Sequence, residues 1–306
     1  MRIVKNSIYL FRSFRPNQWT KNLIVFSAPL FSFNFLPNTW IPAIYATLSF
    51  CLISSSIYLF NDCLDIESDK LHPTKSKRPI ASGKVKVKNA LFASFLLALI
   101  SIFIALNISH SVALLVIGYG LIQILYCTKL KKLPILDLFC IASGFLIRSI
   151  AGLVASDLNL SPWFILSVGL LALFLAVEKR KAELMTFRSR GILTRKVLEY
   201  YSIPLLLRLE STLATSVFMS YSLWASGPIL NGAPTSLMLL TVPLVLGGIF
   251  RYQLLSDPEE ASRRCKENIR FTTEKPEDIL LGDSGIRLIV CVWISMTLII
   301  GLVSKI

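Results

Sequence analysis

Nine long apolar stretches alternate with short polar segments along this chain, and they restrict its fold more than any other feature. Most are long enough to cross the hydrocarbon core of a bilayer as a helix, although Pro29 interrupts the first. Backbone inside that core must satisfy its own hydrogen bonds, so we predict an all-α polytopic membrane protein, a bundle of nine transmembrane helices. The predicted spans are about 22–36, 40–60, 90–108, 111–127, 134–155, 162–182, 211–227, 237–255 and 286–304.

The composition agrees with this class, since 54% of the 306 residues are hydrophobic and only 16% are charged. No linker-like segment divides the chain, so we expect residues 1–306 to form a single membrane-embedded domain. The six cysteines include no Cys-x-x-Cys pair, which argues against a disulfide framework or a zinc site.

The basic residues lie almost entirely on alternate polar segments. Of the 32 Lys and Arg, 30 fall in the N-terminal arm and in segments 62–89, 128–133, 178–210 and 251–287. By the positive-inside rule these segments are cytoplasmic, so we predict the N-terminus on that side and the C-terminus outside. The net charge of +14 therefore reflects orientation in the lipid bilayer. It does not indicate nucleic-acid binding, which would need one continuous basic surface.

An acidic motif follows the second apolar stretch, where a span meets the cytoplasm. Asp62, Asp65 and Asp69 stand at positions i, i+3 and i+7, which share one face of a continuous helix. Three carboxylates there repel one another unless a cation binds among them, and such oxygen ligands suit Mg²⁺ bound to a substrate phosphate. We therefore predict a Mg²⁺ site. The alternative is a solvated acidic helix end beside a basic loop.

Basic side chains come directly after this motif. Lys75, Lys77 and Arg78 can donate hydrogen bonds to phosphate oxygens, Arg78 through two nitrogens of its guanidinium at once. Pro73 and Pro79 stiffen the loop that carries them. We predict a phosphate-binding loop here; the alternative is that these charges only anchor the neighbouring spans in the cytoplasm.

A second group surrounds the turn between the fourth and fifth stretches. It contains Tyr126, Lys129 and Lys131, and then Asp137 at the start of the next span. Arg148 follows Asp137 by eleven residues, about three helical turns, so both side chains can face the bundle interior. An arginine inside an apolar span needs a partner or an anionic ligand. Arg148 thus binds a phosphate, or it forms a structural pair with Asp137.

Three further candidate residues lie on the predicted cytoplasmic side. Lys179 and Glu183 are four residues apart and share a helix face, either within a site or as a simple ion pair. Arg251 opens the segment 251–285, which is long enough to cover a site as a lid and is otherwise a solvated loop.

The acidic motif Asn61-Asp62-x-x-Asp65-x-x-x-Asp69 resembles the signature of the UbiA superfamily of intramembrane prenyltransferases. Within that superfamily, segments over most of the chain look like the branch that transfers phosphoribosyl groups. These segments are Arg15-Pro16-x-Gln18-Trp19-x-Lys21-Asn22, His72-Pro73-Thr74-Lys75, Arg78-Pro79-Ile80-Ala81-Ser82-Gly83, Leu130-Lys131, Pro134-Ile135-Leu136-Asp137, Ala142-Ser143-Gly144-Phe145, Arg148-x-Ile150-Ala151-Gly152, Lys179-Arg180-x-Ala182-Glu183 and Arg251-Tyr252.

The resemblance implies a nine-helix transferase domain with a Mg²⁺-dependent site near the cytoplasmic face of a bacterial plasma membrane. In the implied reaction, phosphoribosyl pyrophosphate gives its 5-phosphoribosyl group to a polyprenyl phosphate such as decaprenyl phosphate, and pyrophosphate leaves. Mg²⁺ held by Asp62, Asp65 and Asp69 would stabilise the leaving pyrophosphate. Lys75 and Arg78 would bind the pyrophosphate or the 5-phosphate.

Other residues receive roles from the same resemblance. Arg148, with Lys129 or Lys131, would hold another phosphate, and Asp137 would meet the ribose hydroxyls as a catalytic residue. Glu183, also expected to be catalytic, stands where other members carry a second aspartate-rich motif. The remaining expected substrate-binding residues are Asn61, Lys21, Lys77, Tyr126, Lys179 and Arg251.

Two alternative functions compete with this one. A UbiA-type prenyltransferase would move a prenyl group from a prenyl diphosphate to an aromatic acceptor, and the missing second Asp-x-x-x-Asp motif argues against it. A lipid or ion transporter would need polar residues through the full depth of the membrane. The predicted outer halves of the spans are instead apolar, apart from isolated Ser, Thr, Asn and Gln.

Overall fold

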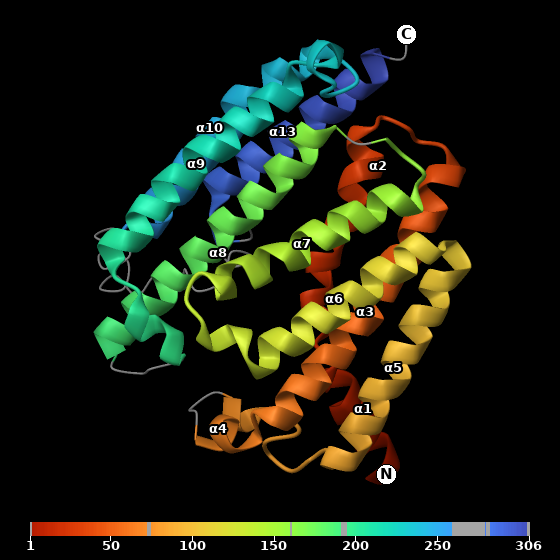
Figure 1. Ribbon diagram of the computed structural model, residues 1–306, viewed down its shortest axis with the longest axis vertical. Coiled ribbons are helices and arrows are strands. Elements are labelled where there is room, and N and C mark those ends of the chain that lie inside the picture. Colours follow the sequence, from red (N-terminus) through yellow and green to blue (C-terminus); the bar gives the residue numbers. More distant parts are fainter. Residues whose placement is uncertain are drawn as a thin grey trace. The chain divides into compact units, whose positions relative to one another are not determined.

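A computed structural model gives the fold of the chain (Figure 1). It describes residues 2–71, 75–159, 161–190, 195–258, 279 and 282–304, and of residues 2–7, 189 and 190 the backbone alone. Within these ranges every regular element is an α-helix or a 3₁₀-helix, the latter labelled η. The predicted all-α class is therefore confirmed.

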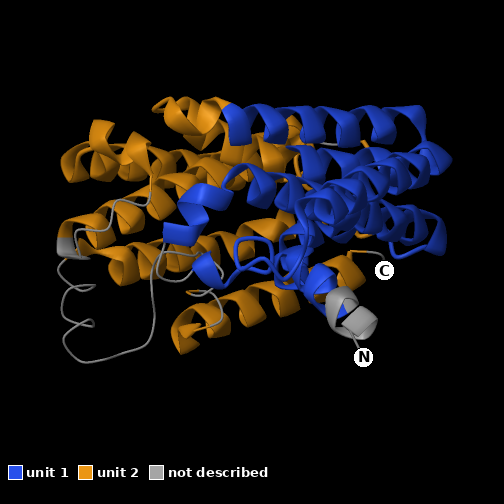
Figure 2. Cartoon of the chain, turned by 90° about the horizontal axis from the view of Figure 1, so that it is seen from below, with its two compact units in different colours: residues 1–30, 34–128, 147–158 blue, residues 31–33, 129–146, 159–306 orange. Residues whose placement is uncertain are grey.

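The chain divides into two compact units (Figure 2). Unit 1 contains residues 1–30, 34–128 and 147–158, and unit 2 contains residues 31–33, 129–146 and 159–306. Each unit has its own buried apolar clusters. The expectation that residues 1–306 act as one domain is not tested by this division and stays a prediction.

Unit 1 is organised by α3 (Pro37–Leu64), which packs along α5 (Val87–Ile108). Ser49 and Ser101 each donate a hydrogen bond to the other's carbonyl oxygen, at 3.0 and 2.8 Å, and Ser56 and Ser94 do the same at 2.7 and 2.8 Å. Such small polar side chains let two helix backbones approach closely inside a membrane. The other elements of unit 1 are α1 (Arg2–Ser13), η1 (Pro16–Phe26), the start of α2 (Ser27–Phe31), α4 (Ile66–Leu71), η2 (Lys75–Lys77), α6 (His110–Thr128) and the second part of α7 (Leu136–Ala155).

Unit 2 is organised by α8 (Pro162–Arg190), which packs against α9 (Ile203–Ala225). A buried aromatic cluster that includes Phe164, Tyr221 and Trp224 forms part of its core. Its other elements are η3 (Leu130–Lys132), the first part of α7, η4 (Lys196–Tyr200), η5 (Pro228–Leu230), η6 (Ser236–Thr241), α10 (Val242–Ser256) and α13 (Ser284–Val303).

Seven of the described helices are long and apolar enough to cross a membrane, and each agrees with a predicted span to within a few residues, except where α3 and α8 extend further at their ends. The predicted count of nine is not reached among them. The prediction of a single helix over 22–36 is wrong, because that stretch is the end of a 3₁₀-helix followed by the five-residue α2. The predicted span 211–227 lies on α9, whose Arg208, Glu210 and many hydroxyl groups reduce its apolar character.

The surface of these helices is suited to lipid. Along α5 the side chains of Phe92, Phe95 and Phe103 are 69%, 63% and 67% exposed, beside several exposed leucines. In water such a face would promote aggregation, whereas in a bilayer it contacts acyl chains. The chain is therefore an integral membrane protein.

Candidate functional site

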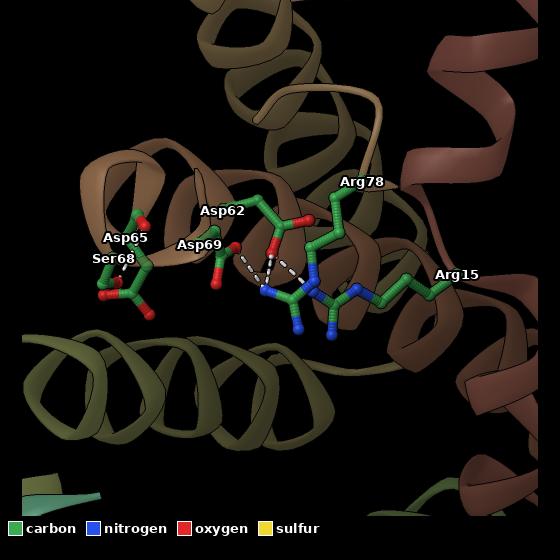
Figure 3. A network of polar contacts seen from close by, with 6 residues as sticks. All are labelled: Arg15, Asp62, Asp65, Ser68, Asp69 and Arg78. Carbon is green, nitrogen blue, oxygen red and sulfur yellow. Dashed lines mark hydrogen bonds and ion pairs between the residues drawn. The ribbon is translucent and has the colours of Figure 1, made fainter. Parts of the chain in front are cut away.

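The first polar cluster lies in unit 1, where α3 ends (Figure 3). Asp62 and Asp69 are only 2% and 3% exposed, and both accept hydrogen bonds from one nitrogen of Arg78. The distances from Arg78 Nη1 are 3.1 Å to Asp62 Oδ1 and 2.5 Å to Asp69 Oδ2. Arg15 also donates to Asp62 Oδ1. Two buried carboxylates are thus neutralised by two guanidinium groups.

The helix that carries the acidic motif is interrupted. Helix α3 ends at Leu64, Asp65 has φ −95° and ψ 12°, and α4 begins at Ile66. The three aspartates therefore do not share one face of a continuous helix, and that prediction is wrong. Asp65 points away from Asp62 and Asp69, and its carbonyl oxygen accepts a hydrogen bond from Ser68 Oγ at 2.9 Å (Figure 3).

The loop after α4 brings Arg78 to the carboxylates. Arg78 N donates to Lys75 O at 2.9 Å, and Val85 N donates to Pro79 O at 3.0 Å, which closes the turn. Gly83 takes φ 72°, a value that favours glycine. Lys75 and Lys77 lie on η2, Lys75 half-buried and Lys77 exposed. Residues 72–74, which belong to the resemblance above, lie outside the described residues.

Arg148 is buried in unit 1, as its place in an apolar span predicted. It is 5% exposed, and its Nε donates to Asn22 Oδ1 at 2.6 Å while its Nη2 donates to the Tyr119 hydroxyl at 2.8 Å. The guanidinium also stands 4.5 Å from the centre of the Tyr119 ring and 5.8 Å from that of Phe50. These contacts stabilise the positive charge of Arg148 inside the apolar span.

Asp137 heads the second polar cluster, in unit 2. Its Oδ2 accepts a hydrogen bond from Arg180 Nε at 2.6 Å, and neither side chain has any exposed surface. Its Oδ1 accepts from the Tyr201 hydroxyl at 2.7 Å, and that hydroxyl accepts from Ile135 N at 2.7 Å. Burial raises the pKa of Tyr201 well above its usual value, so this hydroxyl keeps its proton at neutral pH. The alternative of a structural Asp137–Arg148 pair gives way to an Asp137–Arg180 pair.

Glu183 extends this cluster. Arg180 Nη1 lies 2.5 Å from Glu183 Oε2, and Arg195 Nε lies 3.6 Å from the same oxygen. Next to Arg180 in sequence, Lys181 contacts Glu178 at 2.9 Å and also contacts Glu210, all deeply buried. The neighbouring residues Arg180 and Lys181 therefore point into two different buried networks, and Glu178 belongs to that of Lys181.

The other predicted residues take varied positions. Arg251 forms a bidentate ion pair with Asp283: its Nε donates to Oδ1 at 3.1 Å and its Nη2 donates to Oδ2 at 2.9 Å. Most of the expected lid, residues 259–278 with 280 and 281, lies outside the described part of the chain. The half-buried residues are Asn61, Lys21, Tyr126, Lys131 and Lys179, and Lys129 is exposed.

Sequence reasoning missed Arg15, Arg180 and Tyr201 as members of these clusters. Arg15 and Arg180 occur in the motifs quoted above, but a charge near a span end usually reads as an anchor. Tyr201 gave no signal, because its contact with Asp137 joins residues 64 positions apart.

The carboxylates of the first cluster are the side chains that can be compared with the predicted Mg²⁺ site. In the part of the chain that the structure describes, no group of three or more His, Cys, Asp or Glu side chains is placed to hold a metal ion. Asp62 and Asp69 nevertheless converge on one point, occupied by Arg78 Nη1. Since Mg²⁺ is commonly bound by one or two carboxylates together with substrate phosphates, this pair fits the ion.

Comparison with known proteins identifies the family. A model described as the UbiA prenyltransferase family matches residues 24–272. The chain belongs to the UbiA prenyltransferase family. The match covers α3 and α4 with the carboxylates and Arg78 of the first cluster, and α7 and α8 with the second cluster, whereas Arg15 precedes the matched residues.

Curated relatives match most of the chain. It is similar to a decaprenyl-phosphate phosphoribosyltransferase of Mycolicibacterium smegmatis, with 35% identity over 93% of this chain and 90% of that protein. A protein of the same name from Mycobacterium tuberculosis is 32% identical over 93% and 91%. One from Corynebacterium glutamicum is 41% identical over 70% and 66%.

Solved UbiA structures agree with the fold. A UbiA homologue from Archaeoglobus fulgidus bound to GPP and Mg²⁺ superposes with a TM-score of 0.68 at 19% identity, covering 97% of this chain and 99% of that one. A homologue from Aeropyrum pernix gives a TM-score of 0.64 at 15% identity, with 96% and 98% covered. At these identities the likeness establishes the fold.

Proposed function

We propose that this membrane protein transfers the 5-phosphoribosyl group of phosphoribosyl pyrophosphate to a polyprenyl phosphate, decaprenyl phosphate or a close analogue, in a Mg²⁺-dependent reaction. The observation that carries the proposal is the likeness to relatives named decaprenyl-phosphate phosphoribosyltransferase, at 32% and 35% identity over 93% of the chain. Arg78 beside Asp62 and Asp69 supports it, because a guanidinium can donate to the phosphate oxygens that both reacting partners carry.

In the proposed reaction, a phosphate oxygen of the lipid forms a bond to C1 of the ribose. The bond between C1 and the pyrophosphate oxygen breaks, and pyrophosphate leaves with the electron pair. Mg²⁺, when bound, would stabilise the charge that develops on the leaving group. Asp62 and Asp69 would hold the ion, with Asp65, at the break between α3 and α4, as the third predicted ligand. Arg78 and Lys75 would donate to phosphate oxygens.

The second cluster has a proposed part in binding ribose. Both oxygens of Asp137 already accept a hydrogen bond, one from Arg180 and one from Tyr201. Each carboxylate oxygen can accept a further one, so Asp137 would meet a ribose hydroxyl once substrate binding opens the packing that buries its side chain. Arg180 and Tyr201 would fix its orientation. Arg148 remains a proposed phosphate ligand, and so does Lys129 or Lys131.

The positive-inside pattern supports a cytoplasmic N-terminus and a cytoplasmic site. Phosphoribosyl pyrophosphate, a soluble and highly charged nucleotide precursor, would then reach the enzyme from the cytoplasm. The membrane proposed is a bacterial plasma membrane, which also holds the lipid substrate.

The test is incubation of the purified full chain with radiolabelled phosphoribosyl pyrophosphate, Mg²⁺ and decaprenyl phosphate. We expect a labelled product that extracts into organic solvent. A parallel reaction with a radiolabelled prenyl diphosphate and an aromatic acceptor tests the other UbiA chemistry. Product in that reaction alone would overturn the proposal. Uptake of unmodified lipid into vesicles without any product would favour transport.

A pair of matched variants completes the assay. Asp62→Asn should lower turnover about 100-fold at saturating Mg²⁺, the scale expected on losing a major electrostatic contributor. Glu67→Gln removes a nearby carboxylate that is 88% exposed and pairs only with Lys70 among the contacts described. It should retain activity within about twofold. Equal activity in the two variants would contradict the metal assignment.

A further inference from the structure

Arg15 is held in an unusual backbone conformation beside the acidic motif. It lies between α1 and η1 with φ 54° and ψ 60°, the left-handed region that a side chain with a Cβ disfavours. Gln18 N donates to its carbonyl oxygen at 2.8 Å, and its guanidinium lies 4.9 Å from the centre of the Tyr58 ring. This conformation directs the guanidinium at Asp62 (Figure 3).

The charges of this cluster balance without a metal. Asp62 and Asp69 are almost fully buried, and the guanidinium groups of Arg15 and Arg78 supply one positive charge for each. A divalent cation entering alone would meet two fixed positive charges at short range in a partly desolvated site. A cation that arrives with a diphosphate brings its own negative charge, and the phosphate oxygens offer each guanidinium a new partner.

We propose that Arg15 and Arg78 are exchangeable partners of the metal-binding carboxylates, and that they make metal binding depend on the diphosphate. In the free enzyme they occupy Asp62 and Asp69. When metal and diphosphate bind together, the carboxylates pass to the metal and the guanidinium groups pass to the phosphate oxygens. Arg15 is thus a positioning residue for Asp62 in the free state and a phosphate ligand in the bound state. The inference rests on the proposed function only in requiring a diphosphate at this site.

Two binding measurements on the full chain in detergent test the exchange. Mn²⁺ stands in for Mg²⁺, and its binding in the absence of any anion is followed by loss of the free-ion electron paramagnetic resonance signal. Binding of radiolabelled inorganic pyrophosphate is measured separately by equilibrium dialysis at saturating Mg²⁺. Neither measurement needs turnover.

Arg15→Gln should change the two affinities in opposite directions. Mn²⁺ alone should bind at least about tenfold more tightly, because one opposing charge is gone. Pyrophosphate with Mg²⁺ should bind at least about tenfold more weakly, because one charge-assisted hydrogen bond is lost. A purely structural role for Arg15 would weaken both. Arg12→Gln, an equal change of charge at an exposed site three residues earlier, should leave both within about twofold.

Arg78→Gln provides the second variant and should show the same opposed changes, so the test stands even if Arg15→Gln does not fold. Mn²⁺ binding no tighter than in the native chain for both variants would overturn the exchange. Neither measurement uses phosphoribosyl pyrophosphate or lipid. Opposed changes in a chain that forms no labelled lipid would therefore refute the proposed function and leave this inference intact.

Discussion

The buried pair of Asp137 and Arg180 makes a prediction that separates stability from substrate binding. Neither side chain is exposed, and Arg180 Nε lies 2.6 Å from Asp137 Oδ2. Removing one partner leaves the other charge buried, which typically costs about 3–5 kcal/mol. Asp137→Leu should therefore destabilise the protein strongly, and Arg180→Met should do so to a similar extent. Replacing both removes both charges, so the double variant should recover at least about 2 kcal/mol of the summed loss.

The assay is thermal unfolding in one fixed detergent for the native chain, both single variants and the double variant. A loss of about 3–5 kcal/mol corresponds to a fall of roughly 5–15 °C in Tm for a chain of this size. A second cycle pairs Asp137→Leu with Arg148→Met and should be additive, because Arg148 is hydrogen-bonded to Asn22 and Tyr119. Additive losses in the first cycle would refute the reasoning.

The same variants report on the ribose proposal. If Asp137 meets a ribose hydroxyl, the double variant should recover stability while kcat/KM for phosphoribosyl pyrophosphate stays about 10- to 150-fold low. Activity that returns together with stability would end the claim that Asp137 contacts substrate. Glu199→Ala, at an exposed position on η4, serves as the control for both readouts.

Three further predictions follow from single features. The folded-state pKa of Tyr201 is raised, so its contribution to stability is complete below about pH 10 and is lost as the pH rises further. The fall in Tm between pH 8 and pH 11 should therefore be smaller for Tyr201→Phe than for the native chain. Gly152→Ala should cost about 2 kcal/mol or more, since its new methyl carbon would stand 1.8 Å from Val25 O, and an unchanged Tm would contradict that packing. In intact cells with Cys291 replaced by Ser, a cysteine at Ile229 should react with an impermeant thiol reagent and one at Ser82 should not, whereas the opposite labelling would reverse the predicted orientation.

Seven predicted spans are confirmed because apolar length is a local property of the sequence. The prediction of a single helix over 22–36 was wrong for a reason that the sequence shows only in part. Pro29 signalled an interruption, but nothing in the apolar pattern distinguishes a 3₁₀-helix from an α-helix over residues 16–26. The apolar run 211–227 was correctly predicted to be helical, although α9 begins earlier, at Ile203, and carries Arg208 and Glu210 before residue 211.

The site was predictable in its residue types and less so in its pairings. The spacing of Asp62 and Asp69 located the first cluster. Ideal helix geometry, however, does not predict the break at Asp65. The sequence spacing predicted that Lys179 shares a helix face with Glu183, four residues later. In the structure Glu183 pairs with Arg180, three residues before it. Partners such as Tyr201 depend on tertiary packing, which has no signature in a single sequence.

The paired serines of α3 and α5 also determine which groups of the first cluster are held in place. Four hydrogen bonds from side chain to carbonyl oxygen, spread over two helical turns, prevent α3 from sliding along α5. Asp62 follows Ser56 by six residues on the same helix, so its position relative to α5 is fixed. Any exchange of partners must then be made by the guanidinium groups moving to and from a stationary carboxylate.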